Sequence, residues 1–151
     1  MRLALPLVLA AAVAASALVA QEHPEHPQGK TAATKAVSID DLEKAIKSSV
    51  AAKEKSGGGY YRLADDVDKK TWLLKLDHVH RERLSRLDEK TYFACTDFKS
   101  SDGHLVDVDF FMKDTDGKLV LSDATVHKVD GKPRYNWEEK DGFWKRVPIK
   151  S

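Results

Sequence analysis

The sequence has almost no cysteine and almost no asparagine, and each shortage excludes a class of structure. Its single cysteine, Cys95, cannot form a disulfide within the chain, so the fold cannot be a small cross-linked scaffold. Its single asparagine, Asn136, is followed by Trp and Glu, which excludes an N-glycosylation site. A chain of 151 residues is long enough for one domain with a hydrophobic core.

An excess of charge of either sign is also missing. The chain carries 25 basic and 24 acidic residues, and removal of residues 1–20 takes away only Arg2, which leaves 24 of each. A neutral domain has no long-range attraction for polyanions. We therefore expect no binding to nucleic acid and, once residues 1–20 are removed, none to membranes.

Known catalytic motifs are absent. The sequence contains no P-loop, no Gly-x-Ser-x-Gly, no His-Glu-x-x-His and no Cys-x-x-Cys. A non-enzymatic role is therefore the favoured interpretation, ahead of an enzyme.

The N-terminal segment is typical of a secretory signal peptide. Arg2 provides the positive charge, Leu3 to Val13 the apolar region, and small residues follow before a cut after Ala17 or Ala20. The sequence predicts a signal peptide at 1–20, a disordered linker at 21–36 and a single domain at 37–151. We expect export to a bacterial periplasm or to the extracellular space.

The domain is predicted to begin with an amphipathic helix. Ser38 is a good N-cap residue, and Asp41 stands where the acid of a capping box belongs. Val37 and Leu42 fit a hydrophobic staple across this helix start. The helix is expected to end at the glycines of residues 56–59. One face of it should be apolar, with Ile39, Leu42, Ile46 and Val50.

Short β-rich runs follow the helix, and four Asp-Gly pairs separate the last five of them. Asp-Gly favours the type I′ turn of two-residue hairpins, so these runs predict a five-stranded antiparallel meander. Such turns predict cross-strand pairs of Cys95 with Phe110, Met112 with Leu121, Val126 with Tyr135, Ala124 with Trp137, Trp137 with Arg146, and Glu138 with Lys145. The pair of Trp137 and Arg146 would allow a cation–π contact. The alternation changes phase near Ser122 and Asp123, which predicts a β-bulge there.

The predicted fold class is α+β, with one N-terminal helix packed on a curved antiparallel meander. Over residues 37–148 the order of elements resembles the cystatin-like group of folds, which includes the cone of nuclear-transport-factor-like proteins. This is a likeness of architecture and carries no function. The Gln-x-Val-x-Gly signature of inhibitory cystatins is absent.

Histidines supply the first candidate site. His78 and His80 alternate in a predicted strand, so their rings point to one face and can hold one metal ion. His127 and either Asp107 or Asp109 are further ligands by residue type. The alternative is that both histidines end a strand and contact solvent.

Asp107 and Asp109 are the second candidate, as a ligand-binding pair. They alternate with apolar residues, and Tyr92, Phe98 and Phe111 have the parity that would share their face. A face that mixes carboxylates and aromatics suits a ligand pocket or acid–base chemistry, whereas the simpler interpretation is a solvated strand face. Cys95 is expected on the core face as a buried thiol, unless a one-residue slip turns it outward to serve as a reactive thiol or ligand.

The N-terminal tail offers a conditional site. If cleavage follows Ala20, the mature chain begins Gln21-Glu22-His23, and its amine, two amides and imidazole can bind Cu(II) or Ni(II). Cleavage after Ala17 removes this site.

The sequence thus predicts an exported small binding protein that holds a metal ion, such as Cu, Zn or Ni, or a small ligand on its sheet. The alternative is a protein-interaction or inhibitor module that uses an exposed aromatic face with Tyr135, Trp137 and Trp144.

Overall fold

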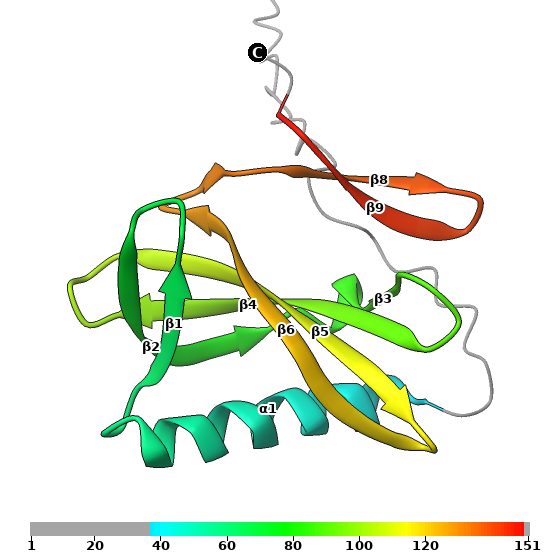
Figure 1. The fold of residues 1–151 in the computed structure, drawn as a ribbon, viewed down its shortest axis with the longest axis horizontal. Coiled ribbons are helices and arrows are strands. Elements are labelled where there is room, and N and C mark those ends of the chain that lie inside the picture. Colours follow the sequence, from blue (N-terminus) through cyan, green and yellow to red (C-terminus); the bar gives the residue numbers. More distant parts are fainter. Residues whose placement is uncertain (1–36, 150–151) are drawn as a thin grey trace, which may run out of the picture.

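The computed structural model describes residues 37–149, and its first element is helix α1 (Ile39–Ser56) (Figure 1). The Ser38 hydroxyl accepts a hydrogen bond from the Asp41 N–H at 3.1 Å, while the Asp41 carboxylate accepts the Ser38 N–H at 3.3 Å. This reciprocal pair is the predicted capping box. Leu42, Ile46 and Val50 are buried as expected, but Ile39, the first residue of the helix, is exposed.

The helix ends at the predicted glycines, but its capping residue does not have the left-handed conformation that was expected. Gly57 caps it with an ordinary φ of −92°, and the left-handed residues are Gly58 and Gly59. Gly57 is required for close approach, since a Cβ there would lie 2.2 Å from the backbone oxygen of Tyr60. The chain therefore turns sharply from α1 into the sheet.

Within residues 37–149, seven strands form one antiparallel sheet in the order β1-β2-β4-β5-β6-β7, and β3 pairs with Tyr92 and Phe93 at the start of β4. A short 3-10 turn (Arg81–Arg83) joins β2 to β3. The strands are β1 (Tyr61–Asp65), β2 (Lys70–Val79), β3 (Ser85–Arg86), β4 (Thr91–Ser100), β5 (Leu105–Thr115), β6 (Lys118–Val129) and β7 (Lys132–Pro133). A separate hairpin follows, made of β8 (Asn136–Lys140) and β9 (Phe143–Val147).

These elements stack as three layers (Figure 1). α1 lies across the inner face of the curled sheet, and the β8–β9 hairpin lies over the opposite face. The predicted α+β class is confirmed: one helix packs on a curved antiparallel sheet. No helix within residues 37–149 has the length and apolarity needed to cross a membrane.

The hairpin turns were predicted with mixed success. Asp116, Asp130 and Asp141 each have φ of 50° to 55° and precede a glycine of positive φ, as in type I′ turns. The predicted pairs of Met112 with Leu121, Trp137 with Arg146 and Glu138 with Lys145 are confirmed. So is the β-bulge, because the register shifts between Phe111 and Met112, opposite Ser122. The Arg146 guanidinium, however, lies over the rings of Phe111 and Tyr135, at 4.9 and 5.2 Å from their centroids.

The meander does not continue through all five runs. The pairs predicted between β6 and the next run, Val126 with Tyr135 and Ala124 with Trp137, are wrong, since β6 pairs with only two residues of β7. Pro133 has no N–H with which to extend the ladder. The chain then leaves the sheet and crosses to the hairpin layer.

Arg134, which follows β7, binds to the β1–β2 turn at the opposite end of the sheet. Its guanidinium donates to the carboxylates of Asp65 and Asp68, at 2.7 Å each, and Trp72 Nε1 donates to Asp65 at 2.7 Å. Burial raises the pKa of Asp65, but the hydrogen bonds from Arg134 and Trp72 outweigh burial and hold the pKa at about 2. The β1–β2 hairpin and the segment between β7 and β8 are therefore joined through one ionised carboxylate.

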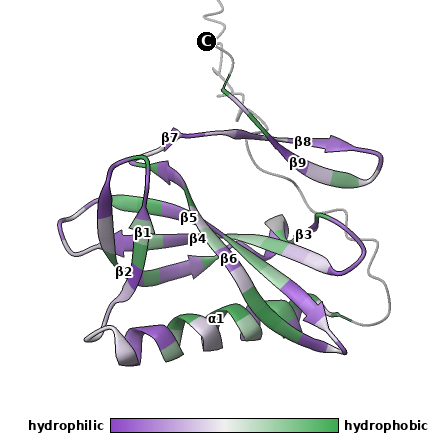
Figure 2. Ribbon diagram, in the orientation of Figure 1, coloured by the Kyte–Doolittle hydropathy of each residue, from purple (hydrophilic) through white to green (hydrophobic). Residues whose placement is uncertain are grey.

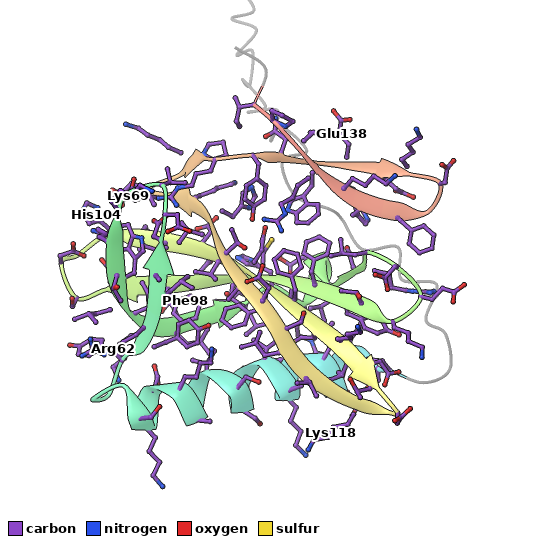
Figure 3. All side chains as sticks on the ribbon, in the orientation of Figure 1. Arg62, Lys69, Phe98, His104, Lys118 and Glu138 are labelled. Carbon is purple, nitrogen blue, oxygen red and sulfur yellow. The ribbon has the colours of Figure 1, made fainter. Side chains whose placement is uncertain are left out.

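Two hydrophobic cores occupy the two spaces between the layers. The larger lies between α1 and the sheet and includes Phe98 (Figure 3), which stacks on Phe110. The smaller lies between the sheet and the hairpin, where Trp137 stacks on Phe93 with ring centroids 4.2 Å apart. Figure 2 shows hydrophobic and hydrophilic residues interspersed along α1 and the strands. β4 and β5 contribute alternate residues to the two cores, with Ala94 and Phe110 in the larger one and Phe93 and Phe111 in the smaller one.

Candidate functional site

Polar side chains form a row on the sheet face that the β8–β9 hairpin covers. Strand alternation places Cys95 and Asp97 of β4 on this face, opposite Asp109 and Asp107 of β5 respectively. Phe93, two residues before Cys95, belongs to the hydrophobic core under the hairpin. The row therefore begins in that core and runs out toward the end of β2.

The predicted partner of Cys95 is wrong by one residue, because Ala94 stands opposite Phe110 instead. The reason is the turn at residues 101–103. The Ser100 N–H donates to the His104 oxygen at 2.9 Å, and the Ser100 hydroxyl accepts the His104 N–H at 2.8 Å, which closes a three-residue loop rather than a two-residue turn. Cys95 is still buried, as predicted, because the hairpin covers the face to which it turns.

The same slip changes which aromatics accompany the aspartates. Phe111 shares the face of Asp107 and Asp109, as expected. Tyr92 and Phe98 do not, since both belong to the core on the helix side. The aspartate face is therefore completed by Phe93 of β4 and by Tyr135 and Trp137 from the C-terminal part of the chain.

His78 and His80 lie together at the exposed end of the row. Their rings are perpendicular, with centroids 4.9 Å apart. Glu82 joins them from the 3-10 turn, so that one potential ligand atom from each residue lies within 4.8 Å of the other two. His78 and Glu82 are exposed and His80 is half-buried. The group is accessible to an ion from solution.

His80 stands between two carboxylates. Its Nδ1 is 3.0 Å from Glu82 Oε1, and its Nε2 is 2.9 Å from Asp97 Oδ1. Each of these short contacts needs a hydrogen or a cation between the ring nitrogen and the carboxylate oxygen. A neutral imidazole has only one N–H, so it can satisfy only one of the two contacts. The pocket around His80 therefore favours a positive charge, supplied by a second proton or by a metal ion.

Asp107 lies behind this group. Burial raises its pKa to about 6, helped by the charge of Asp97 opposite, and the effect is opposed by Lys128 and His80. Two facing carboxylates cannot both ionise without cost. Asp107 therefore takes up a proton at a higher pH than an ordinary aspartate, and Asp97 is the carboxylate in direct contact with His80.

Asp109 is the central acceptor of the buried end. Its carboxylate accepts hydrogen bonds from the Cys95 thiol at 2.8 Å, the Tyr135 hydroxyl at 2.6 Å and Trp137 Nε1 at 3.0 Å. Burial and the Asp109 charge raise the pKa of Tyr135, which keeps its hydroxyl a donor. Three donors, two of them buried and Tyr135 half-buried, thus converge on one buried carboxyl group.

His127 belongs to this buried end and not with His78 and His80. It is the extra residue of a second β-bulge in β6, where the register shifts between Asp107 and Val108, and it is fully buried. Its Nδ1 lies 3.7 Å from Asp109 Oδ2. The predicted candidates thus fall into two groups, His78 with His80, and Cys95, Asp109 and His127, with Asp107 between them.

Sequence reasoning missed Glu82 and Asp97. Asp97 carries a recognisable signal, since it alternates with Cys95 in the same strand and so shares its face. Glu82 carries none, because it follows the end of β2 in a 3-10 turn that no alternation describes. His23 lies outside the described residues, as do the predicted signal peptide and linker.

The expected aromatic face is covered. Trp137 is 4% exposed, and Tyr135 and Trp144 are half-buried, because the hairpin turns these side chains toward the sheet. A hollow of about 270 Å³ lies elsewhere, at the start of α1, where Leu42, Leu84 and Tyr92 form part of its wall. None of the predicted site residues lines this hollow.

Within residues 37–149, the two groups of metal-ligand type therefore lie along one row, one at its exposed end and one at its buried end. Comparisons with protein-family models, with curated proteins and with solved structures gave no match, so the site must be interpreted from its own geometry.

Proposed function

We propose that this protein is an exported binding protein that holds one divalent transition-metal ion between His78, His80 and Glu82. The observation that carries the proposal is the convergence of three ligand-type side chains at the accessible end of the polar row, with ligand atoms within 4.8 Å of one another. Two imidazoles and a carboxylate are a ligand set that Zn²⁺ accepts, with a fourth position for water.

The contacts of His80 support a definite assignment of its nitrogens. Nδ1 faces Glu82 and would carry the ion, and Nε2–H donates to Asp97. A carboxylate that accepts the second N–H of a ligating imidazole orients the ring and makes it a stronger ligand. The 2.9 Å contact between His80 Nε2 and Asp97 Oδ1 supports that role for Asp97.

Zn²⁺ suits this site best, because two imidazoles with one carboxylate match its common ligands. Cu²⁺ binds the same nitrogens more strongly in general. The cysteine thiol lies at the other end of the row, buried, and takes no part in this exposed group. The proposal also includes export, with residues 1–20 removed, and a second Cu(II) or Ni(II) site at His23 if the cut follows Ala20.

Zinc binding by matched variants tests the site. All proteins carry His23→Ala and His26→Ala, so that the tail contributes nothing. Zn²⁺ is titrated into each protein in competition with a chromophoric chelator, and the ions bound per chain are counted. We expect His78→Ala/His80→Ala to bind one ion fewer than its parent.

His104→Ala is the control, because His104 (Figure 3) is also a histidine beside a carboxylate, with Asp130 at 2.7 Å, but belongs to neither metal-ligand group found among residues 37–149. It should bind as many ions as the parent. Asp97→Asn should keep the ion with roughly tenfold weaker affinity or more. Equal binding by His78→Ala/His80→Ala and His104→Ala would refute the proposal.

A further inference from the structure

The buried end of the row is a second cluster of metal-ligand type, independent of the first. Cys95, Asp109 and His127 come from the neighbouring strands β4, β5 and β6, and none is more than 1% exposed. One ligand atom from each lies within 4.8 Å of the other two. Thiol, carboxylate and imidazole in one buried space are unusual in a small domain, since charged groups are seldom fully buried without a partner.

We propose that Cys95, Asp109 and His127 form a closed site for a thiophilic divalent ion of the Zn²⁺ class. Bond lengths of about 2.3 Å to sulfur and about 2.0 Å to nitrogen or oxygen place tetrahedral ligand atoms about 3.3 to 3.5 Å apart. Two separations in the structure lie on either side of this range, with 2.8 Å from the Cys95 sulfur to Asp109 Oδ1 and 3.7 Å from His127 Nδ1 to Asp109 Oδ2. The three ligand atoms lie within 4.8 Å of one another, so small shifts would let them fill three of the four tetrahedral positions.

The orientation of His127 is set for ligation. Its Nε2 lies 3.0 Å from the backbone oxygen of Tyr135, which only accepts hydrogen bonds. The ring hydrogen is therefore on Nε2, and Nδ1, which faces Asp109, has the lone pair in the neutral ring. Stacking on the Tyr135 ring, with centroids 4.6 Å apart, holds the imidazole in this plane. The β-bulge at His127 directs this side chain inward.

Binding replaces one proton. The Cys95 thiol now donates its hydrogen to Asp109, and on binding the S–H bond breaks, a sulfur–metal bond forms and the proton leaves to solvent. No electron is transferred. Thiolate and carboxylate together neutralise a divalent ion, so the loaded centre has no net charge, which suits a buried position. Asp109 Oδ2 keeps its bonds from Tyr135 and Trp137.

The hairpin forms the cover of this site. Within residues 37–149, β8 and β9 pair only with each other, so the cover is held over the sheet by side chains rather than by a backbone ladder. An ion can enter when Tyr135 and Trp137 separate from Asp109, without breaking any strand pair. Loading should accordingly be slow compared with the exposed histidine site, and the bound ion should resist chelators for longer.

Cobalt titration tests the closed site, because thiolate ligation to Co²⁺ gives an intense near-ultraviolet charge-transfer band. The full chain is reduced, freed of metal and titrated with Co²⁺. Cys95 is the only cysteine, so any such band reports this residue. We expect the band in the parent and equally in His78→Ala/His80→Ala, which separates this proposal from the first one.

His127→Asn removes a ligand at the far side of the ion and keeps a polar side chain of smaller size. We expect it to weaken Co²⁺ binding, followed at the same band, by roughly tenfold or more while circular dichroism shows a native fold. Tyr135→Phe removes a hydrogen bond to Asp109 but no ligand, and should retain the band. Absence of the band in the folded parent would overturn the proposal, as would unchanged affinity in folded His127→Asn.

Discussion

Asp65 ties two distant parts of the chain together, and its ionisation should set how the protein tolerates acid. The Asp65 pKa is about 2 in the folded protein against 3.8 for an ordinary aspartate. Each pKa unit corresponds to about 1.4 kcal/mol, so the ionised carboxylate contributes on the order of 2 kcal/mol to the free energy of unfolding. Its side chain is only 3% exposed, and little of this contribution is lost to solvent screening.

The direction of the pH dependence follows from the lowered pKa. The contribution is complete above pH 3.8 and is lost as the pH falls toward 2, because there the unfolded chain binds the proton first. Between about pH 6 and pH 2.5 the loss should amount to about 1 to 2 kcal/mol. Below this range the link between Asp65 and Arg134 no longer favours the folded state.

Urea unfolding at the two pH values measures this effect. Asp65→Asn keeps the shape and an acceptor for Trp72 but cannot ionise, so its deficit in unfolding free energy relative to wild type should shrink by about 1 to 2 kcal/mol at the lower pH. Asp66→Asn is the matched control, since Asp66 is the exposed neighbour and its deficit should not change with pH. A deficit of Asp65→Asn that is the same at both pH values would contradict the reasoning.

Three further predictions concern stability. Gly57→Ala should destabilise by about 1 to 3 kcal/mol in thermal melts, because its Cβ would meet the Tyr60 oxygen; an unchanged melting temperature would disprove the close approach. Ser38→Ala should cost about 1 kcal/mol in urea unfolding, with Ser38→Thr recovering most of it, and equal loss in both would argue against capping. Trp137→Ala should cost about 3 to 5 kcal/mol in urea unfolding, since it removes the stack on Phe93, and a cost below 1 kcal/mol would mean that the hairpin packs weakly.

The fold class followed from the sequence because its local patterns were strong. The Ser38 cap, the apolar face of the helix and the three type I′ turns each depend on a few neighbouring residues. At Asp102-Gly103 the predicted two-residue turn is wrong, because Ser100 hydrogen-bonds to His104 across the loop and makes it three residues long. No local pattern distinguishes this turn from the others, and one residue was enough to exchange the two faces of β4.

The site was predictable only in part, for a related reason. His78 and His80 stand two residues apart, so their proximity is a local property of the chain. The grouping of His127 with Cys95 depends on a bulge in β6 and on the packing of a hairpin that leaves the sheet after Pro133. Both are tertiary effects, which override alternation and cannot be obtained from spacing alone.

The sheet curls without closing, and this has a consequence for association between molecules. Along the outer sides of β1 and of most of β6, residues 37–149 provide no further strand, so two rows of backbone donors and acceptors face a gap lined by Lys53, Arg62 and Asp123. Unpaired edges invite a strand from another chain. Here the bulge at Ser122 interrupts one edge, and charged side chains stand at the other. Replacing both Lys53 and Arg62 with neutral residues should therefore increase aggregation of the folded protein without first lowering its free energy of unfolding.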